Sequence, residues 1–424
     1  MRWLLARSLP ALLIGVLSGA TLWGLDELAE LLQGALWEAL PHAIGVDPSS
    51  GWWIFAVLAL TGVAVGLVLQ FAPGHGGFDS ATHELDAPVL PLRTLPGLAL
   101  VTVLALAGGV SLGPESPIIA INTGIVVLLV TRFLPFYSAP LAALTTASAT
   151  IGAMFGTPVA AALLLTGVLA ALPARGALWD RLFLPLVAAG AGAVTMLLLG
   201  GPMVGMALPK AESLGLPELG AAAAIAVAAA AIGVLGALAF PWVHRAFHAL
   251  RYPLLIASAG GVVLGALGAL GGPVTLFKGL HETGELLTRA GEFGLGGLAL
   301  VLAVKLAALL VSASAGFRGG RIFPALFLGV ATGLLAQALV PQIPLGVAVA
   351  SGVLGMVLAV GRDGWLALML AALVAGDVAL LPILALAVLP AWLVVTAAPH
   401  FLVRPRAPEA GAEPAAPERA GASA

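Results

Sequence analysis

Apolar segments of about membrane-spanning length alternate along this chain with short polar or glycine- and proline-rich breaks. The first two are residues 4–25 and 52–71, and the acidic, tryptophan-bearing stretch 26–40 between them predicts a separate interfacial helix. The later segments that we predict as helices are residues 95–112, 118–130, 139–155, 158–172, 182–199, 219–240, 254–270, 298–315, 325–339, 346–360, 365–373 and 380–402. Residues 278–292 are more polar and resemble a re-entrant segment. The pattern predicts an all-α integral membrane protein with about 16 to 18 tilted and broken helical segments.

Composition supports the membrane class. Hydrophobic residues make up 61% of the 424 residues, charged residues make up 9%, and the mean hydropathy is +1.10, whereas a soluble domain is about a quarter charged. The chain has no cysteine, which excludes disulfides and cysteine-ligated zinc. The net charge of −2 does not indicate a partner, and we expect no cofactor, no metal and no nucleic-acid partner.

Two halves with similar breaks make up the predicted transmembrane domain, residues 1–403. The halves are about 1–200 and 218–403, joined by a polar stretch at 201–217. Short interrupted segments at matching places favour an inverted-repeat transporter with a site near mid-membrane, although apolar stretches also resemble one another by chance. Residues 404–424 lack periodicity and predict a disordered tail. Arginines at positions 2, 7, 404 and 406 favour two cytoplasmic termini.

The first informative break is Gly113-Pro114-Glu115-Ser116-Pro117, which separates two very apolar segments. A carboxylate in hydrocarbon costs a few kcal/mol, so Glu115 is expected to face a cavity and to have a partner. The prolines end one helix and start the next, which directs the positive end of a helix toward the carboxylate. Alternatively, Glu115 serves only as an anion at a helix start.

The second informative break is Gly316-Phe317-Arg318-Gly319-Gly320-Arg321-Ile322-Phe323-Pro324. Its glycines let backbone N–H groups approach a ligand, and its two arginines favour an anion. Alternatively, Arg318 and Arg321 are solvated in a surface vestibule. Lys305 lies within an apolar segment and would snorkel, pair with a carboxylate or add positive potential to an anion path.

Histidines provide the remaining candidates. His75 lies in the break Gly74-His75-Gly76-Gly77-Phe78, where a structural role competes with a role in binding an anion or relaying protons. His244 and His248 are spaced as on a metalloprotease helix, but no glutamate lies between them. Solvated histidines at a helix end are therefore the favoured interpretation, and we expect no enzyme activity.

These motifs resemble the chloride channel and chloride/proton antiporter (CLC) family. The first break resembles that family's G-(R/K)-E-G-P, residues 305–324 resemble a stretch running from a lysine to G-x-x-G-G-x-F-x-P, and residues 376–382 resemble T-G-D-x-x-L-I-L-P. The resemblance covers about residues 5–403. It implies that Glu115 is a gating glutamate and that the backbone near Gly74, Gly76, Gly113, Gly319, Gly320, Ile322 and Phe323 contacts a small anion. It also implies a homodimer with one pore in each subunit.

Departures from the family pattern shape the expected mechanism. His75 replaces an anion-binding serine, Phe401 falls at the place of an anion-coordinating tyrosine, and Gly167 or Val168 stands where an internal proton-transfer glutamate is expected. We therefore predict acid-stimulated flux of chloride or a similar small anion in a cell membrane, gated by Glu115 and channel-like or loosely coupled to protons. The alternatives are a coupled chloride/proton antiporter and a scaffold that moves another anion such as fluoride.

Overall fold

The computed structural model describes residues 2–83, 89–171, 177–201, 205–206, 208–210 and 214–403, with side chains described from residue 6 and not at 168–171. Within this part of the chain the regular elements are helices. The sixteen α-helices are α1 (Arg2–Gly34), α2 (Leu40–Ile44), α3 (Gly51–Phe71), α4 (Leu95–Ala107), α5 (Glu115–Phe133), α6 (Ala139–Phe155), α7 (Pro158–Ala171), α8 (Leu178–Leu198), α9 (Leu216–His248), α10 (Pro253–Gly271), α11 (Leu280–Thr288), α12 (Ala290–Ser314), α13 (Ile322–Leu339), α14 (Leu345–Gly361), α15 (Gly364–Ala375) and α16 (Leu381–Thr396).

Many of these helices are apolar enough for a bilayer. Among the described residues, nine helices are long and apolar enough to cross a membrane, and five more are apolar but shorter. Helices satisfy their own backbone hydrogen bonds, which is what a hydrocarbon environment requires of a spanning segment. The prediction of an all-α, multi-pass membrane protein with many partial helices is confirmed.

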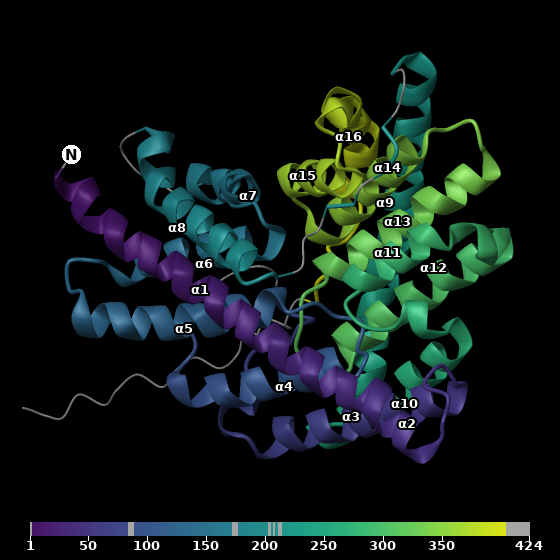
Figure 1. Cartoon of the computed structure of the whole chain (residues 1–424), viewed down its shortest axis with the longest axis horizontal. Coiled ribbons are helices and arrows are strands. Elements are labelled where there is room, and N and C mark those ends of the chain that lie inside the picture. Colours follow the sequence, from purple (N-terminus) through teal and green to yellow (C-terminus); the bar gives the residue numbers. More distant parts are fainter. Residues whose placement is uncertain are drawn as a thin grey trace, which may run out of the picture.

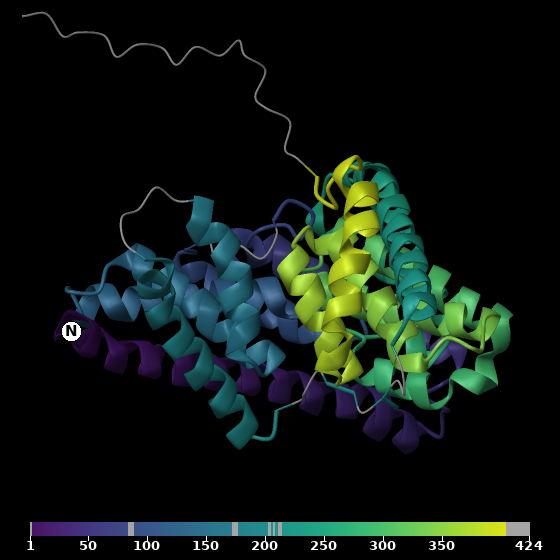
Figure 2. The ribbon, with the colours of Figure 1, turned by 90° about the horizontal axis from the view of Figure 1, so that it is seen from above.

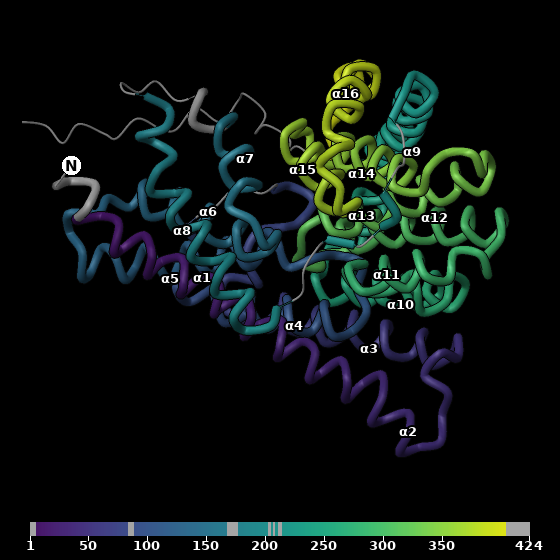
Figure 3. Tube along the Cα trace, turned by 45° about the horizontal axis from the view of Figure 1, so that its top comes forward, coloured from purple at the N-terminus to yellow at the C-terminus, as the bar shows by residue number. Residues whose placement is uncertain are grey.

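The order and packing of helices repeat in the two halves. α1 and α9 each have 33 residues, and α6 and α14 each have 17. α1 packs on α6 and α8, as α9 packs on α14 and α16, and the pairs α5–α6 and α13–α14 also correspond. In Figures 1 and 3 the helices α5–α8 lie on one side of the molecule and α9–α16 on the other. This is the inverted-repeat fold predicted from the matching breaks.

The two halves pack most closely along α3 and α10. A Cβ added at Gly62 of α3 would lie 2.5 Å from the Ala257 carbonyl oxygen, and one added at Gly261 of α10 would lie 2.5 Å from the Leu58 carbonyl oxygen. Both distances are shorter than a carbon–oxygen contact allows, so these positions require glycine. Small residues at such a crossing let two backbones approach and gain van der Waals contact in lipid.

The N-terminal segment differs from the prediction. Residues 4–25 and 26–40 do not form a span and a separate interfacial helix, because α1 continues through Asp26 and is followed directly by the π-helical turn Ala35–Ala39 and α2. No proline separates the two predicted segments, and Asp26 is 7% exposed and paired inside the protein. α1 runs across the molecule and ends in α2 beside the second half (Figures 1 and 2).

Several other boundaries also differ. α4 ends at Ala107 rather than at residue 112, because Gly108-Gly109 follows and Gly109 has a φ of +88°. α9 continues beyond residue 240 to His248 with Pro241 inside it, and α12 begins at Ala290 with a kink at Gly294. α16 ends at Thr396, which leaves Phe401 in a loop rather than in the last helix. The predicted disordered tail, 404–424, lies outside the described residues.

Candidate functional site

The first break (residues 113–117) and the second break (residues 316–324) are joined by an antiparallel β-bridge. The Gly113 N–H donates to the Gly320 carbonyl at 2.9 Å, and the Gly320 N–H donates to the Gly113 carbonyl at 2.7 Å. The opposite chain directions at this bridge agree with the inverted orientation of the halves. α5 and α13 therefore begin side by side in the protein interior.

Glu115 lies at this junction and is fully buried. Its Oε1 accepts a hydrogen bond of 2.8 Å from the backbone N–H of Phe323, in the first turn of α13, which begins at Ile322. Its Oε2 is buried and has no hydrogen-bond partner among the described residues. The first N–H groups of a helix have no partner within the helix and carry partial positive charge. The carboxylate thus occupies the place where a small anion would be stabilised.

Two glycines shape the space around the carboxylate. A Cβ added at Gly113 would lie 2.2 Å from Glu115 Oε2, and one added at Gly320 would lie 2.0 Å from the same atom. Neither position tolerates a side chain while the carboxylate stays in place. The bridge and the absence of side chains at these two residues together define a pocket the size of a carboxylate.

Arg318 connects the second break to the glycine loop (residues 74–78). Its Nε donates to the Gly76 carbonyl at 3.1 Å, and its Nη2 lies 3.3 Å from the His75 carbonyl oxygen. The side chain is 11% exposed, so the alternative of a solvated arginine is wrong for Arg318. The His75 ring turns back toward α3, where its Nδ1 lies 2.9 Å from the Leu69 carbonyl oxygen.

Arg321 connects the second break to the loop that contains Phe401. Its guanidinium donates to the carbonyl oxygens of Phe401 and, at 3.2 Å, of His83. Arg321 is 7% exposed, so it is not solvated either. The buried Phe401 ring packs against Phe240 with ring centroids 4.8 Å apart.

Lys305 has a different environment from the one expected. Its Nζ donates to three backbone carbonyls, those of Thr275 (3.1 Å), Leu276 (2.7 Å) and Phe277 (2.9 Å), and lies 4.9 Å from the Phe327 ring centroid. The side chain is fully buried. Neither snorkelling nor pairing with a carboxylate describes this geometry, because the ammonium holds the turn after α10. Its contribution to the potential along an anion path stays a prediction.

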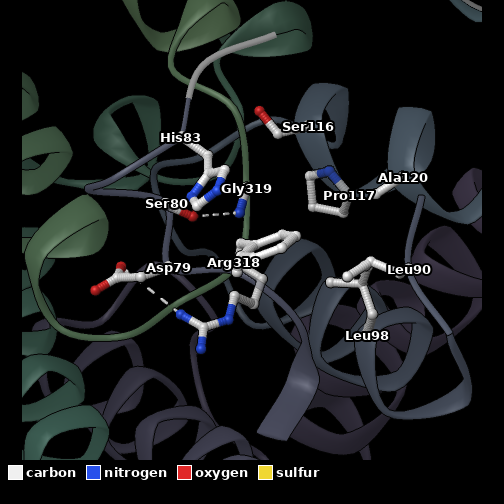
Figure 4. Close-up of a pocket in the computed structure, with 11 residues that line it drawn as sticks. Asp79, Ser80, His83, Leu90, Leu98, Ser116, Pro117, Ala120, Arg318 and Gly319 are labelled. Atoms are coloured by element: carbon white, nitrogen blue, oxygen red, sulfur yellow. Dashed lines mark hydrogen bonds and ion pairs between the residues drawn. The ribbon is translucent and has the colours of Figure 1, made fainter. Parts of the chain in front are cut away.

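Sequence reasoning missed Ser80. Its Oγ donates to the Phe317 carbonyl at 2.8 Å and accepts from the Gly319 N–H at 2.9 Å, both in the second break. Figure 4 shows Ser80 beside Gly319 and Arg318 in a cavity of about 30 Å³, which Ser116 of the first break also lines. The sequence signal for Ser80 was its position shortly after the glycine loop.

Sequence reasoning also missed an ion pair between Asp26 of α1 and Lys278, whose Oδ1 and Nζ are 3.1 Å apart. Both residues line a large cavity of about 680 Å³ and a small one of about 10 Å³, and Pro114 and Phe323 line the small one. Pro114, just before Glu115, therefore lines the small cavity beside Asp26 and Lys278, and Ser116, just after Glu115, lines the cavity beside Ser80. The sequence signal for Asp26 was a charge directly at the end of the apolar segment 4–25.

His244 and His248 lie at the end of α9, as predicted, but they are paired within the protein and not merely solvated. Both ring Nε2 atoms face Oδ2 of Asp79, at 3.4 and 3.5 Å, and Asp79 Oδ1 lies 3.7 Å from Arg318 Nη1. Burial opposes ionisation of Asp79, but the contacts with the two histidines and the charge of Arg318 outweigh it and hold the pKa of this carboxyl well below its usual range. We call Asp79, His244 and His248 the Asp79 cluster.

Inverted halves, paired breaks and a buried carboxylate at a helix start are typical of a membrane transport protein. The family profile described as Voltage gated chloride channel matches residues 49–396. A relative from Escherichia coli (strain K12 / DH10B), named as the ion-transport protein YfeO, is 43% identical over 392 residues, 92% of this chain and 93% of the relative. The YfeO protein of Salmonella schwarzengrund (strain CVM19633) is 44% identical over 396 residues, 92% of this chain and 95% of that protein. The chain belongs to the voltage gated chloride channel family, whose members transport anions and are not enzymes.

Solved structures agree with this assignment at the level of fold. A slow cyanobacterial Cl⁻/H⁺ antiporter has a TM-score of 0.78 at 16% identity, covering 94% of this chain and 95% of its own. A CLC-type fluoride/proton antiporter has a TM-score of 0.70 at 19% identity, covering 94% and 98%. At these identities the likeness establishes the architecture and not the transported ion.

Proposed function

We propose that this protein moves chloride or a similar small anion across a cell membrane and that Glu115 gates the path. The observation that carries the proposal is the position of the Glu115 carboxylate. One of its oxygens accepts from the first turn of α13, while the other is buried between Gly113 and Gly320 without a hydrogen-bond partner among the described residues. A carboxylate held in this way occupies the place of an anion.

The gating mechanism follows from the charge of this carboxylate. When it is ionised, it competes with an anion for the start of α13 and blocks the path. When it is protonated, it loses the attraction of the helix start, and an anion can take its place. Acid is therefore expected to stimulate flux, and a high anion concentration to favour displacement of the carboxylate.

The neighbouring residues supply the rest of the proposed site. The backbone at Gly74, His75 and Gly76 belongs to the glycine loop, and the backbone at Gly319, Gly320, Ile322 and Phe323 belongs to the second break, which Arg318 joins to that loop. Arg318 and Arg321 bring positive charge to these segments. Phe401 contributes a buried ring without a hydroxyl donor.

We propose that coupling to protons is weak. A proton does not cross apolar packing without a relay, and Gly167 on α7 offers none at the place where the family's internal glutamate is expected; the Val168 side chain lies outside the described residues. Phe401 likewise cannot hydrogen-bond an anion at an inner gate. A coupled chloride/proton antiporter and a fluoride transporter remain the alternatives, and relatives by fold carry both of these titles.

We also propose a homodimer with cytoplasmic termini and one path in each subunit. Within α16, Leu386, Leu389 and Leu393 are 60–67% exposed, and in α8 Leu197 and Leu198 are 62% and 80% exposed. These apolar faces suit a contact with lipid or with a second subunit. Native mass spectrometry from detergent that releases only monomers would contradict the dimer.

The test is a flux measurement on the purified protein in chloride-loaded vesicles, with chloride efflux and proton movement recorded together. We expect acid-stimulated efflux with little proton movement in the wild type, and pH-independent efflux in Glu115→Gln. Glu292→Gln is the matched control, because that glutamate is exposed and pairs only on the surface with Arg289. Retained pH dependence in Glu115→Gln would refute the gate, whereas proton pumping at a fixed ratio to chloride would refute weak coupling. Fluoride-loaded vesicles identify the anion.

A further inference from the structure

Lys278 is a positively charged residue beside the proposed gate that the gating mechanism does not use. Its ion pair with Asp26 lines both the large cavity and the small cavity. The small cavity reaches Pro114, next to Glu115, and Phe323, whose N–H binds the Glu115 carboxylate. The Lys278 ammonium is also close enough for its charge to act on that carboxylate. The pair therefore stands at the junction of the two cavities, on the side of Glu115 where Pro114 lies.

Lys278 and Lys305 use their ammonium groups differently. An ammonium has three N–H donors. Those of Lys305 donate to three backbone carbonyls. Lys278, in the described part of the chain, donates to Asp26 alone, at 3.1 Å, and its side chain is 20% exposed. Two of its donors are therefore available to water or to an anion in the cavities.

The backbone before Lys278 is held in a strained turn. Phe277 has a φ of +56°, in the left-handed region that an aromatic residue rarely adopts. Its N–H donates to the Gly109 carbonyl at 3.0 Å, its carbonyl accepts from Lys305, and its ring packs edge-on against Trp37 with centroids 5.4 Å apart. Such strain persists only where surrounding contacts impose it, and it clusters at functional sites. The turn fixes the direction in which Lys278 leaves the backbone, toward the two cavities.

The other ionisable groups of the large cavity do not offer an anion such a contact. Glu30 and Glu38 are exposed carboxylates, and the buried Glu282 caps the start of α11 with a hydrogen bond of 3.1 Å. His281 is exposed on α11. An anion that enters this cavity is repelled by the carboxylates and attracted by the ammonium of Lys278.

We propose that Lys278 receives the anion on its way between the large cavity and the site at Glu115, and that Asp26 is the internal competitor that the anion replaces. This inference rests on the proposed function, because it concerns the same path. The Asp26 carboxylate neutralises the ammonium when no anion is present, and an arriving anion takes its place. Because the pair is mostly buried, salt screens it less than a surface pair. The pair thus sets the chloride concentration at which the path fills.

The test neutralises one partner of the pair at a time. The purified full-length protein in vesicles exchanges labelled chloride at acid pH, with equal concentrations on both sides so that its orientation does not matter. In Lys278→Gln we expect the half-saturating chloride concentration to rise about fivefold, the factor that corresponds to one partly exposed ion contact. In Asp26→Asn we expect it to fall by a similar factor, because the anion no longer displaces a carboxylate. Lys278→Arg keeps the charge and should restore a value close to that of the wild type.

Two further variants control this experiment. Glu30→Gln is the matched control, because Glu30 lines the same cavity and is exposed, while the ion pair of Lys278 in the described part of the chain is with Asp26. It should saturate like the wild type. The double variant Asp26→Asn/Lys278→Gln should resemble Lys278→Gln, since without the ammonium Asp26 has nothing for which to compete.

Opposite shifts in the two single variants support the inference. Shifts in the same direction that follow lowered unfolding midpoints, or unchanged saturation in both variants, overturn it and make the pair a structural contact. A shift in Glu30→Gln as large as that in Asp26→Asn overturns the role of Asp26 as competitor. If the wild type exchanges no chloride, titration calorimetry with chloride in detergent decides between the two proposals. Weaker chloride binding in Lys278→Gln then contradicts the proposed function alone, and equal binding contradicts both.

Discussion

The first and second breaks have the same backbone and different chemistry. Each contributes one glycine to the bridge, and each opens a helix in which a proline is the third residue, Pro117 in α5 and Pro324 in α13. The first break supplies a carboxylate, and the second supplies backbone donors and two arginines. An inverted repeat can therefore assign the occupant of a site to one half and the binding groups to the other.

The two breaks also differ in how firmly they are held. The second break is tied to the glycine loop, to Ser80 and to the Phe401 loop by hydrogen bonds. The Glu115 side chain, by contrast, has one hydrogen bond from Phe323 and an oxygen without a partner among the described residues. We infer that the second break is the scaffold and Glu115 the moving part. Damage to the scaffold should reduce stability, and damage around Glu115 should alter gating.

Lys305→Met is expected to have the largest effect. The substitution leaves three backbone carbonyls, buried or partly buried, without their donor, and each such loss in a buried place costs about 1–3 kcal/mol. We expect a destabilisation on the order of 4 kcal/mol, measured as a lower thermal unfolding midpoint in detergent than that of the exposed control Lys210→Met. An unchanged midpoint combined with altered pH dependence of flux would instead place Lys305 on the anion path.

Arg321→Met tests the scaffold within the second break. It removes the donor to the carbonyls of Phe401 and His83, so we expect a loss of about 3 kcal/mol. Unfolding midpoints compared with those of Arg132→Met, at an exposed position, measure the effect. The pH midpoint of flux should stay where it is in the folded fraction, and a loss of pH dependence like that expected for Glu115→Gln would mean that Arg321 belongs to the gate.

Gly113→Ala tests the moving part. The three atoms nearest the new methyl group would all belong to the carboxyl group of Glu115, at 2.2–2.7 Å, so the carboxylate must leave its place. We expect efflux at neutral pH to rise about tenfold, equivalent to about 1.4 kcal/mol, and to lose its pH dependence.

Two variants control this experiment. Gly190→Ala, on α8, meets no atom within 4 Å and should behave like the wild type. In Glu115→Ala the carboxylate is absent, so adding Gly113→Ala should cause no further change. A further increase in the double variant would show that Gly113 acts independently of Glu115.

Ser80→Ala is expected to have the smallest effect. It removes one donor and one acceptor from the second break, which should cost about 1 kcal/mol. Ser138→Ala is a suitable control, because that exposed serine makes no capping hydrogen bond. Equal unfolding midpoints for the two variants would show that Ser80 does not support the second break.

The sequence could predict the elements whose signal is local. Long apolar runs identify membrane helices by length alone, and glycine and proline identify the breaks. Glu115 was recognisable because a charge in an apolar segment requires an explanation. His75 at the place of a serine and Phe401 at the place of a tyrosine could also be recognised from the sequence, because both lie at positions that the family resemblance identifies.

The sequence could not predict which distant groups meet. Burial requires that Asp26 have a partner, yet nothing near it in the chain identifies Lys278 as that partner, 252 residues away. His244 and His248 were misjudged for the same reason, because Asp79 lies 165 residues before His244. The continuity of α1 was missed because its acidic residues suggested an interface, whereas Asp26 is buried within the protein.

The bridge between the two breaks has a consequence for biosynthesis. Glu115 and the N–H that binds it are 208 residues apart in the chain. Glu115 therefore leaves the ribosome long before Phe323 is synthesised. Until then, the Glu115 side chain lacks the N–H group that binds it in the folded protein. Contacts of such long sequence separation form late in folding, after the loop between them has closed. The proposed anion site thus forms only when the two halves dock, and a chain that stops before residue 323 would contain Glu115 without the N–H group that binds its carboxylate.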